Sequence, residues 1–302
     1  MKKTGAPEPD PSAIGVIPKP PFVRLPEPAT VFAGRAARFR TLAEGHELAP
    51  YLRFLAGLAD AQAGLVDGPE PELPGSEVLD RAARHAMPPL DRNGAAATLD
   101  GLLDRLLDRA RGIDMPPAAR AALDRVTAAD DGERAAMVAN ALADAIPFEA
   151  IAEHALVTAA LQVHFARLAS RLDAQRLKPV GDGACPACGG PPVASLVVGW
   201  TRPEGVRYCA CSLCGTLWNY VRAKCTLCAA TADISLRSIP GDDGTVKAEC
   251  CAACRGYVKV LYQQQRPELE PVADDVATLG LDLLVREEGF RRGAVNPFLT
   301  GY

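Results

Sequence analysis

The segments CPACG (185–189), CSLCG (211–215), CTLCA (225–229) and CAACR (251–255) decide the fold of the second half of this chain of 302 residues. Each segment holds one Cys-x-x-Cys pair, and the last two pairs follow the first two at a fixed offset of 40 residues. The same offset matches Ser195 with Ser235. Each unit therefore reads Cys-x2-Cys-x22-Cys-x2-Cys, and a small internal duplication explains this better than chance.

This spacing predicts two metal ions per chain, one in each unit. A Cys-x-x-Cys turn aims two thiolates at one point, and the returning chain supplies the other two. The expected ligands are Cys185, Cys188, Cys211 and Cys214 in the first unit, and Cys225, Cys228, Cys251 and Cys254 in the second.

Tetrahedral thiolate sites suit both zinc and iron, so the spacing leaves the metal open. Glycine follows both cysteine pairs only in the first unit, as Gly189 and Gly215, whereas the second unit has Ala229 and Arg255 there. Glycine lets backbone N–H groups approach the sulfurs and tune an iron centre. We therefore expect redox-active iron, readily replaced by zinc, in the first unit and structural zinc in the second.

Disulfides are the main alternative for these cysteines. They need an oxidising compartment, and the N-terminal Met-Lys-Lys is followed by alternating proline and acidic residues rather than the apolar core of a signal peptide. No stretch is long enough and apolar enough to span a membrane, so we expect a cytoplasmic protein. Thioredoxin-like exchange normally uses a single pair at a strand-to-helix junction, whereas strand-like runs follow these pairs.

The overall charge argues against nucleic acid as a partner. The chain has a formal net charge of −4 and a pI of about 5.7. Residues 181–266 contain nine Lys/Arg against six Asp/Glu. Two divalent ions with four thiolates each would add a charge of −2 per site, so these basic residues are expected to balance thiolates rather than phosphates.

The predicted fold class is α+β: an N-terminal helical bundle, two tandem rubredoxin-like or zinc-ribbon-like β units, and a C-terminal helix. Eight prolines in the first 28 residues predict an extended or disordered arm. The expected divisions are the arm at 1–28, the helical bundle at 29–178, the two metal units at 183–222 and 223–266, and the C-terminal helix and tail at 267–302.

Hydrophobic periodicity predicts the elements within these divisions. Helices are expected to begin near residues 28 and 50 and to cover 99–110, 117–127, 131–145 and 148–173, the last as the central helix. Strands are expected at 193–200, 206–210, 216–221, 234–239 and 257–262. One continuous helix is expected over 273–288, with Leu279, Leu283 and Leu284 facing inward and Gly289 ending it.

No catalytic constellation is apparent, so we expect a protein that is not an enzyme. His154 and His164 lie ten residues apart on one predicted helix, about 15 Å along its axis, too far to share an ion. Cys209 and Cys250 fall outside the repeat and are expected as buried free thiols, with Cys209 alternatively a reactive or substitute ligand. Trp218 and Tyr220 suit either packing or base stacking.

Three segments together resemble the formate dehydrogenase accessory proteins of the FdhE type: CPACGGPPVAS (185–195), RYCACSLCGTLWNYVRAKCTLC (207–228) and CCAACRGYVKV (250–260). The resemblance extends to PEPATVFAGRAARFRTLAEGH near the N-terminus, ALQVHFARLA, and DDVATLGLDLLVREEGFRRGAVNPFL near the C-terminus. It implies a non-catalytic factor that contacts the catalytic subunit of formate dehydrogenase and binds iron through the cysteine pairs. A nucleic-acid-binding zinc ribbon and a rubredoxin-like electron-transfer or thiol-handling protein stay open.

Overall fold

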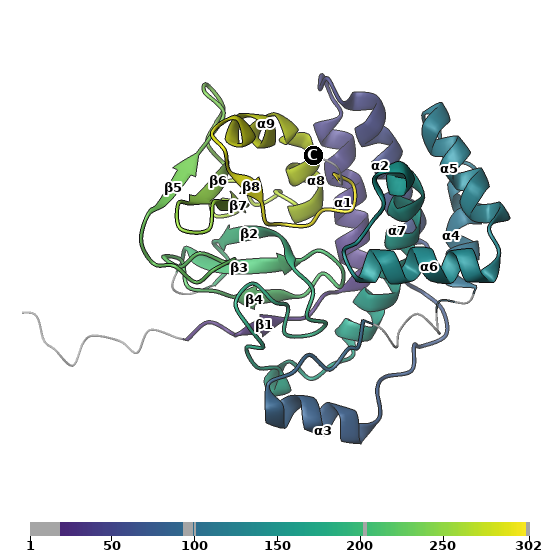
Figure 1. Cartoon of the computed structure of the whole chain (residues 1–302), viewed down its shortest axis with the longest axis horizontal. Helices are drawn as coiled ribbons and strands as arrows, with labels where there is room; N and C mark the ends of the chain where they lie inside the picture. Colours follow the sequence, from purple (N-terminus) through teal and green to yellow (C-terminus); the bar gives the residue numbers. More distant parts are fainter. Residues whose placement is uncertain (1–18, 93–98, 100, 202–203, 300–302) are drawn as a thin grey trace, which may run out of the picture.

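The computed structural model describes residues 19–92, 99, 101–201 and 204–299. A helical part and a sheet lie side by side, with two further short helices against the sheet (Figure 1). This arrangement confirms the predicted α+β class. The N-terminal helices are α1 (Pro28–Leu42), α2 (Ala49–Ala63), α3 (Ser76–His85), α4 (Leu102–Ala110), α5 (Pro117–Ala128), α6 (Asp131–Leu142) and α7 (Ile151–Ser170).

Helix α7 is the centre of the helical part, as its periodicity predicts. Nearly its whole circumference is buried, and Leu161 and Phe165 have no exposed surface. Helices α1, α2, α4, α5 and α6 all pack against it. Local signals set several helix starts: proline opens α1 and α5, and a capping box of Asp130 and Glu133 opens α6. Helix α3, which the periodicity did not reveal, lies apart from the bundle (Figure 1).

The two cysteine units build one continuous sheet. Its strands are β1 (Val23–Arg24), β2 (Pro192–Val198), β3 (Val206–Cys211), β4 (Leu217–Asn219), β5 (Ile234–Arg237), β6 (Val246–Cys251), β7 (Gly256–Leu261) and β8 (Arg291–Arg292). The order is β1-β4-β3-β2-β7-β6-β5, with β8 beside β7. Strands β2, β3 and β4 come from the first unit and β5, β6 and β7 from the second, and the parallel pair of β2 and β7 joins them.

The described end of the proline-rich arm is extended and ordered. Strand β1 pairs antiparallel with β4, with Val23 opposite Trp218. The hydroxyl of Tyr208 donates a hydrogen bond of 2.7 Å to the carbonyl of Pro21. Proline tolerates such an edge position because it needs no ladder donor there. Residues 1–18 of the predicted arm lie outside the described residues.

The strand registers correct one match of the sequence repeat. Ser195 lies opposite Cys209, and the residue 40 positions after Cys209 is Glu249. Glu249 lies opposite Leu236, not opposite Ser235. Leu236 is therefore the spatial counterpart of Ser195. The residues of β5 match those of β2 at an offset of 41 positions, one more than the 40 that separate the cysteines. A one-residue displacement turns a strand's side chains to the other face, so the sequence match of Ser195 with Ser235 does not extend to equivalent places in the sheet.

The predicted C-terminal helix is two helices, α8 (Pro271–Ala277) and α9 (Leu279–Glu287), separated at Thr278. The buried ammonium of Lys259 accounts for the break. It donates hydrogen bonds of 2.8 Å and 3.0 Å to the carbonyls of Asp275 and Thr278, which a continuous helix would use internally. The prediction of a single helix was therefore wrong, whereas Gly289 ends α9 at a φ of 80° as expected.

The inward face of α9 also differs from the prediction. Leu283 and Leu284 are 48% and 41% exposed, and the buried residues are Leu281, Asp282 and Val285. An aspartate occupies the position where the apolar pattern requires a leucine, because Asp282 pairs with buried cations. The prediction failed because apolar periodicity places only apolar residues on the buried face of a helix, and Asp282 is polar.

The helical part and the sheet share one core. Apolar residues of α7 such as Phe165 and of β2 such as Leu196 belong to the same buried cluster. Two ion pairs join α1 to the chain around α8: Arg38 to Asp274 at 2.7 Å, with both side chains buried, and Arg35 to Glu270 at 3.0 Å. Among the described residues, none of the helices combines the length and apolar character that a membrane crossing requires.

Candidate metal centres

The structure brings the eight predicted ligands together as two clusters of four. In the first, the Sγ atoms of Cys185 and Cys214 are 3.6 Å apart and those of Cys188 and Cys211 are 3.5 Å apart. All four ligand atoms lie within 4.8 Å of one another. A tetrahedral ion with metal–sulfur bonds of about 2.3 Å places its sulfurs about 3.8 Å apart. The first cluster is therefore sized for a tetrathiolate ion.

The second cluster repeats this geometry at slightly larger spacing. The Sγ atoms of Cys225 and Cys254 are 3.9 Å apart, and those of Cys228 and Cys251 are 3.7 Å apart. Its four ligand atoms also lie within 4.8 Å of one another. Both clusters are composed of soft thiolate donors, which suit zinc and iron.

The main chain around the clusters is repeated as well. The N–H of Cys185 donates a hydrogen bond of 2.9 Å to the carbonyl of Gly190. The carbonyl of Cys185 accepts a hydrogen bond of 2.8 Å from the N–H of Gly189. Cys225 makes the same two bonds with residues 229 and 230, at 3.1 Å and 2.8 Å. The turn of each first knuckle is thus fixed by backbone bonds, independent of the side chains between the cysteines.

Every knuckle ends in a residue with positive φ, which explains the two glycines of the first unit. Gly189 and Gly215 have φ of 74° and 72°, and Ala229 and Arg255 have φ of 64° and 56° at the equivalent places. Glycine adopts this left-handed conformation without strain, whereas a residue with a Cβ is strained by it. The second unit therefore holds the same turn at a higher conformational cost.

Backbone N–H groups point at sulfur in both units. The amides of Leu213 and Cys214 each lie 3.4 Å from the Sγ of Cys211, and that of Leu227 lies 3.4 Å from the Sγ of Cys225. Burial raises the pKa of the Cys211 thiol, but hydrogen bonds from the other three cysteines and from the backbone outweigh it and lower this pKa well below its usual value. The first cluster thus stabilises a thiolate, the form that binds a metal, at Cys211, while burial raises the pKa of Cys185 well above its usual value.

The two clusters differ in how deeply their cysteines are buried. All four cysteines of the first are buried, because the helical part covers it on two sides. The amide of Leu90 donates to the carbonyl of Ala187 in the first knuckle at 3.0 Å. The side chain of Gln162, on α7, donates to the carbonyl of Ser212 in the second knuckle at 2.8 Å.

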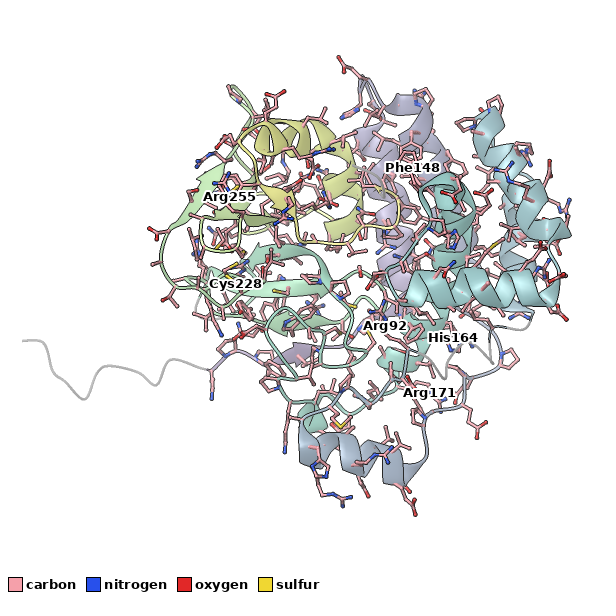
Figure 2. All side chains as sticks on the ribbon, viewed as in Figure 1. Arg92, Phe148, His164, Arg171, Cys228 and Arg255 are labelled. Atoms are coloured by element: carbon pink, nitrogen blue, oxygen red, sulfur yellow. The ribbon has the colours of Figure 1, made fainter. Side chains whose placement is uncertain are left out.

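The second cluster lies open by comparison. Cys228 is exposed and Cys254 is half-buried, and Figure 2 shows Cys228 on the part of the sheet away from helices α1 to α7. Residues 252 and 253, at the turn between the other two ligands, are exposed alanines. One side is covered by the side chain of Leu227, which fills the space over Gly256 and Gly293.

A buried ion pair joins the two units. The guanidinium of Arg207, on β3, makes two hydrogen bonds to the carboxylate of Glu249, on β6, at 3.0 Å and 2.9 Å. It also contacts the hydroxyl of Ser195 and the carbonyl of Lys224. Burial raises the pKa of Glu249, and Arg207 opposes this rise. The sequence repeat gave no sign of this pair, because residue 249 is the counterpart of Cys209.

The two remaining cysteines lie outside both clusters and are buried thiols, as the default interpretation expects. The Sγ of Cys209 is 3.7 Å from the hydroxyl of Ser195, and that of Cys250 is 3.8 Å from the carbonyl of Ala248. Burial raises the pKa of each thiol to about 11, so both stay protonated at neutral pH. A reactive or metal-ligating Cys209 is not supported by this geometry.

The histidines and aromatic residues take structural positions. His154 and His164 are buried on α7, and burial lowers the pKa of His164 to about 4. Trp218 is buried behind β1, so it offers no stacking surface. The single O–H of Tyr220 is shared between the carboxylate of Asp182 at 2.8 Å and the carbonyl of Cys225 at 3.0 Å, which holds the third knuckle.

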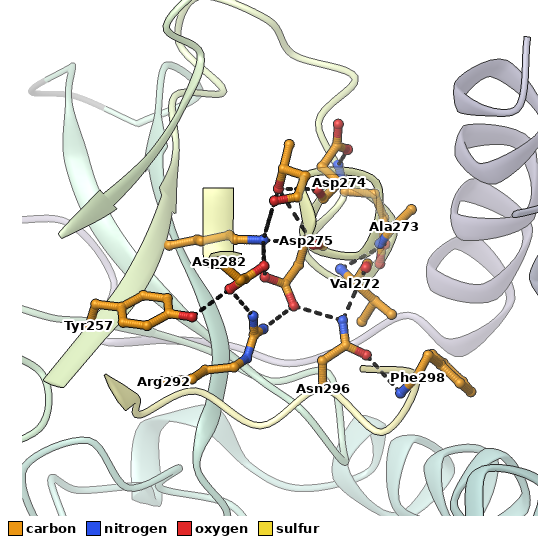
Figure 3. A network of polar contacts seen from close by, with 12 residues as sticks. Tyr257, Val272, Ala273, Asp274, Asp275, Asp282, Arg292, Asn296 and Phe298 are labelled. Atoms are coloured by element: carbon orange, nitrogen blue, oxygen red, sulfur yellow. Dashed lines mark hydrogen bonds and ion pairs between the residues drawn. The ribbon is translucent and has the colours of Figure 1, made fainter. Parts of the chain in front are cut away.

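A buried charge network anchors the C-terminal segment (Figure 3). Lys259 and Arg292 each pair with both Asp275 and Asp282. The hydroxyl of Tyr257 donates to Asp282 at 2.7 Å. Two cations and two anions cancel in charge, and broken pairs would leave buried ions without partners. The sequence analysis did not predict the ion pairs of the adjacent Asp274 and Asp275.

A helical bundle whose core continues into a sheet with two tandem four-cysteine clusters defines a metal-binding protein with rubredoxin-like or zinc-ribbon-like units. Sequence models of three FdhE regions match the chain: the N-terminal region at residues 20–182, the central domain at 184–222 and the C-terminal domain at 223–299. The chain belongs to the FdhE family.

Individual relatives agree along the whole length. The chain is 46% identical over 300 residues to a protein FdhE homolog of Rhizobium meliloti strain 1021, covering 98% of both chains. It is 39% identical to a homolog of Stutzerimonas stutzeri strain A1501, covering 93% of both. The crystal structure of the FdhE protein from Pseudomonas aeruginosa superposes with a TM-score of 0.82 at 33% identity, covering 93% of this chain and 99% of that one.

Proposed function

We propose that this protein is an assembly factor for formate dehydrogenase, which binds the catalytic subunit in the cytoplasm and is required for its activity. Membership of the FdhE family over nearly the full chain carries this proposal. The two four-cysteine clusters support it, because they give a rigid β scaffold of the kind that presents a surface to a partner. The protein itself is proposed to have no catalytic activity.

The eight clustered cysteines are proposed as the ligands of two metal ions. A four-thiolate site has no open coordination position, so it stabilises a fold or transfers single electrons rather than binding a substrate. The six principal strands are short, and small β units of this kind gain much of their folding free energy from the metal. The ions would therefore hold together the sheet that supports the partner surface.

We further propose iron in the first cluster and zinc in the second. The burial of the first cluster supports this choice, because a dry site around the sulfurs tunes an iron–thiolate potential. Anaerobically purified protein should gain thiolate-to-iron absorption on oxidation. Cys211→Ser should abolish this absorption and Cys251→Ser should largely keep it. A colourless protein with two zinc ions under all expression conditions would contradict the iron assignment.

Deletion of the gene tests the main proposal. Cells without the protein should lose formate oxidation, and expression of the wild-type chain should restore it. The tagged chain should capture the catalytic subunit from these cells, while the purified chain should oxidise no formate. Full formate dehydrogenase activity in deletion cells, with no second copy present, would rule the proposal out.

A further inference from the structure

The two edges of the sheet end differently. At one edge, the outermost strand is β1, which has two residues and pairs with β4, so the N-terminal segment leaves little unpaired backbone there. At the other edge, β5 has β6 as its sole partner among the described strands. Figure 1 shows β5 at the outer margin of the sheet, away from the helical bundle. An edge strand of this kind presents unpaired N–H and C=O groups and is a template for an added strand.

The pairing with β6 shows which main-chain groups of β5 face outward. The N–H of Ala252, just after β6, donates to the carbonyl of Asp233 at 3.0 Å, so the main-chain groups of Asp233 point toward β6. Along an antiparallel strand, the N–H and C=O groups of successive residues point alternately toward and away from the paired strand. Ser235 therefore directs its N–H and C=O toward β6, while Ile234 and Leu236 direct theirs away from the sheet. The Leu236 carbonyl accepts a long bond of 3.4 Å from the Arg237 side chain, in agreement with this direction.

The first unit shows what the equivalent edge binds. Leu236 is the spatial counterpart of Ser195 on β2, and Ser195 lies beside Val260 of β7 in a parallel pair. The carbonyl of Val197, on the same edge of β2, accepts the N–H of Gln264 at 3.0 Å. The edge of β2 is thus covered by a parallel strand, and the corresponding edge of β5 has no such cover among the described strands.

The side chains beside the edge suit an apolar strand. Leu236 is 46% exposed. It lines a cavity of about 350 Å³ whose other walls include Val197, Val260 and the buried pair of Arg207 and Glu249. A charged side chain often blocks an open edge; Arg237 is tied through its Nε to Glu288 on the α9 side at 2.8 Å, and only its long bond of 3.4 Å to the outward carbonyl of Leu236 would have to be displaced by an added strand.

We propose that β5 binds an extended segment of a partner polypeptide, parallel to itself, as β7 binds β2. This inference rests on the proposed function, because the partner is the catalytic subunit of formate dehydrogenase. The segment is uncharged where it meets β5 and places a β-branched apolar side chain beside Leu236, as Val260 does beside Ser195. Main-chain hydrogen bonds supply the affinity, and the cavity selects the side chain.

Leu236→Pro tests this directly, with Leu236→Thr as the matched control. Proline removes the outward N–H of residue 236 but none of the bonds from β5 to β6, which residues 235 and 237 make. Threonine keeps the N–H and suits a strand. Leu236→Pro should capture about tenfold less catalytic subunit than the wild-type chain, and Leu236→Thr should stay within about twofold.

A second measurement guards against misfolding. Both variants should retain two equivalents of metal, and a photoreactive benzoylphenylalanine at position 236 should cross-link to the catalytic subunit. Wild-type capture by a Leu236→Pro chain with full metal content, or no cross-link, would overturn the inference while leaving the proposed function intact. A wild-type chain that captures no subunit would overturn both. A dimer of this chain that Leu236→Pro dissociates would assign the edge to a second copy instead and also overturn the inference.

Discussion

The two metal units share one cysteine spacing and one backbone turn, yet their surroundings differ. The first cluster lies buried against the helical part, held by the amide of Leu90 and the side chain of Gln162. The second lies at the surface with Cys228 exposed. The ligands of a metal site are thus set locally, within 30 residues, whereas access to the site is set by the chain packed around it. We expect the first site to hold the molecule together and the second to be exchangeable.

The largest expected effect comes from removing one ligand at equivalent places, with Cys211→Ser and Cys251→Ser. Each should lose about one metal equivalent, because a three-thiolate site is weaker and open. Cys211→Ser should also disrupt the interface with the helices, so its thermal midpoint should fall by about 10 °C more than that of Cys251→Ser. Calorimetry and metal analysis measure both effects. Equal falls in the midpoint would remove the proposed difference between the units.

Competition with a chelator should resolve the two sites by rate. Loss of metal should follow two phases of equal amplitude, with the exposed second site releasing its ion at least about tenfold faster. This ratio corresponds to a difference of about 1.4 kcal/mol in the barrier. Cys251→Ser should remove the fast phase and Cys211→Ser the slow one. A single phase for the wild-type protein would show that burial does not govern release.

Gln162→Leu should weaken the first site alone. Gln162 donates to the carbonyl of Ser212 and accepts from Gln62 at 3.0 Å, so its loss leaves buried groups without partners and costs about 1–3 kcal/mol. The slow phase of metal release should accelerate and the fast phase should not change. Gln263→Leu is the control, because Gln263 bonds the carbonyl of Leu269, away from both clusters. Equal acceleration of both phases would argue for a general loss of stability.

The last effect is a pH dependence from His164, on the helix that holds the first site, and it is absent at neutral pH. Burial lowers its pKa from 6.5 to about 4, so the folded state favours the neutral ring. The contribution of the neutral His164 ring to the free energy of unfolding is complete above pH 6.5 and is lost as the pH falls toward 4. At pH 5 the loss amounts to about 2 kcal/mol.

Urea unfolding at pH 7 and pH 5 checks this prediction. The wild-type protein should lose about 2 kcal/mol more than His164→Gln between these two values. Both proteins carry the same thiolate ligands, so acid release of metal cancels in the comparison. Identical pH profiles would show that the ring is not a source of acid sensitivity.

Local patterns were enough to predict much of this structure. Cysteine spacing predicted the two clusters because ligands of one ion lie close in sequence, and apolar periodicity predicted α7 because that helix is buried all round. Long-range polar contacts defeated the same reasoning. Lys259 takes the carbonyls that would continue α8 into α9, and Asp282 takes an inward place from leucine. The fusion of both units into one sheet likewise depends on a pairing that no local pattern encodes.

The buried network around Lys259 also orders events during synthesis. Lys259, Asp275 and Asp282 are translated before Arg292, which supplies the second cation. Until Arg292 leaves the ribosome, one ammonium faces two buried carboxylates, and strand β8 cannot join β7. The charges of this network therefore cannot balance before residue 292 has been made.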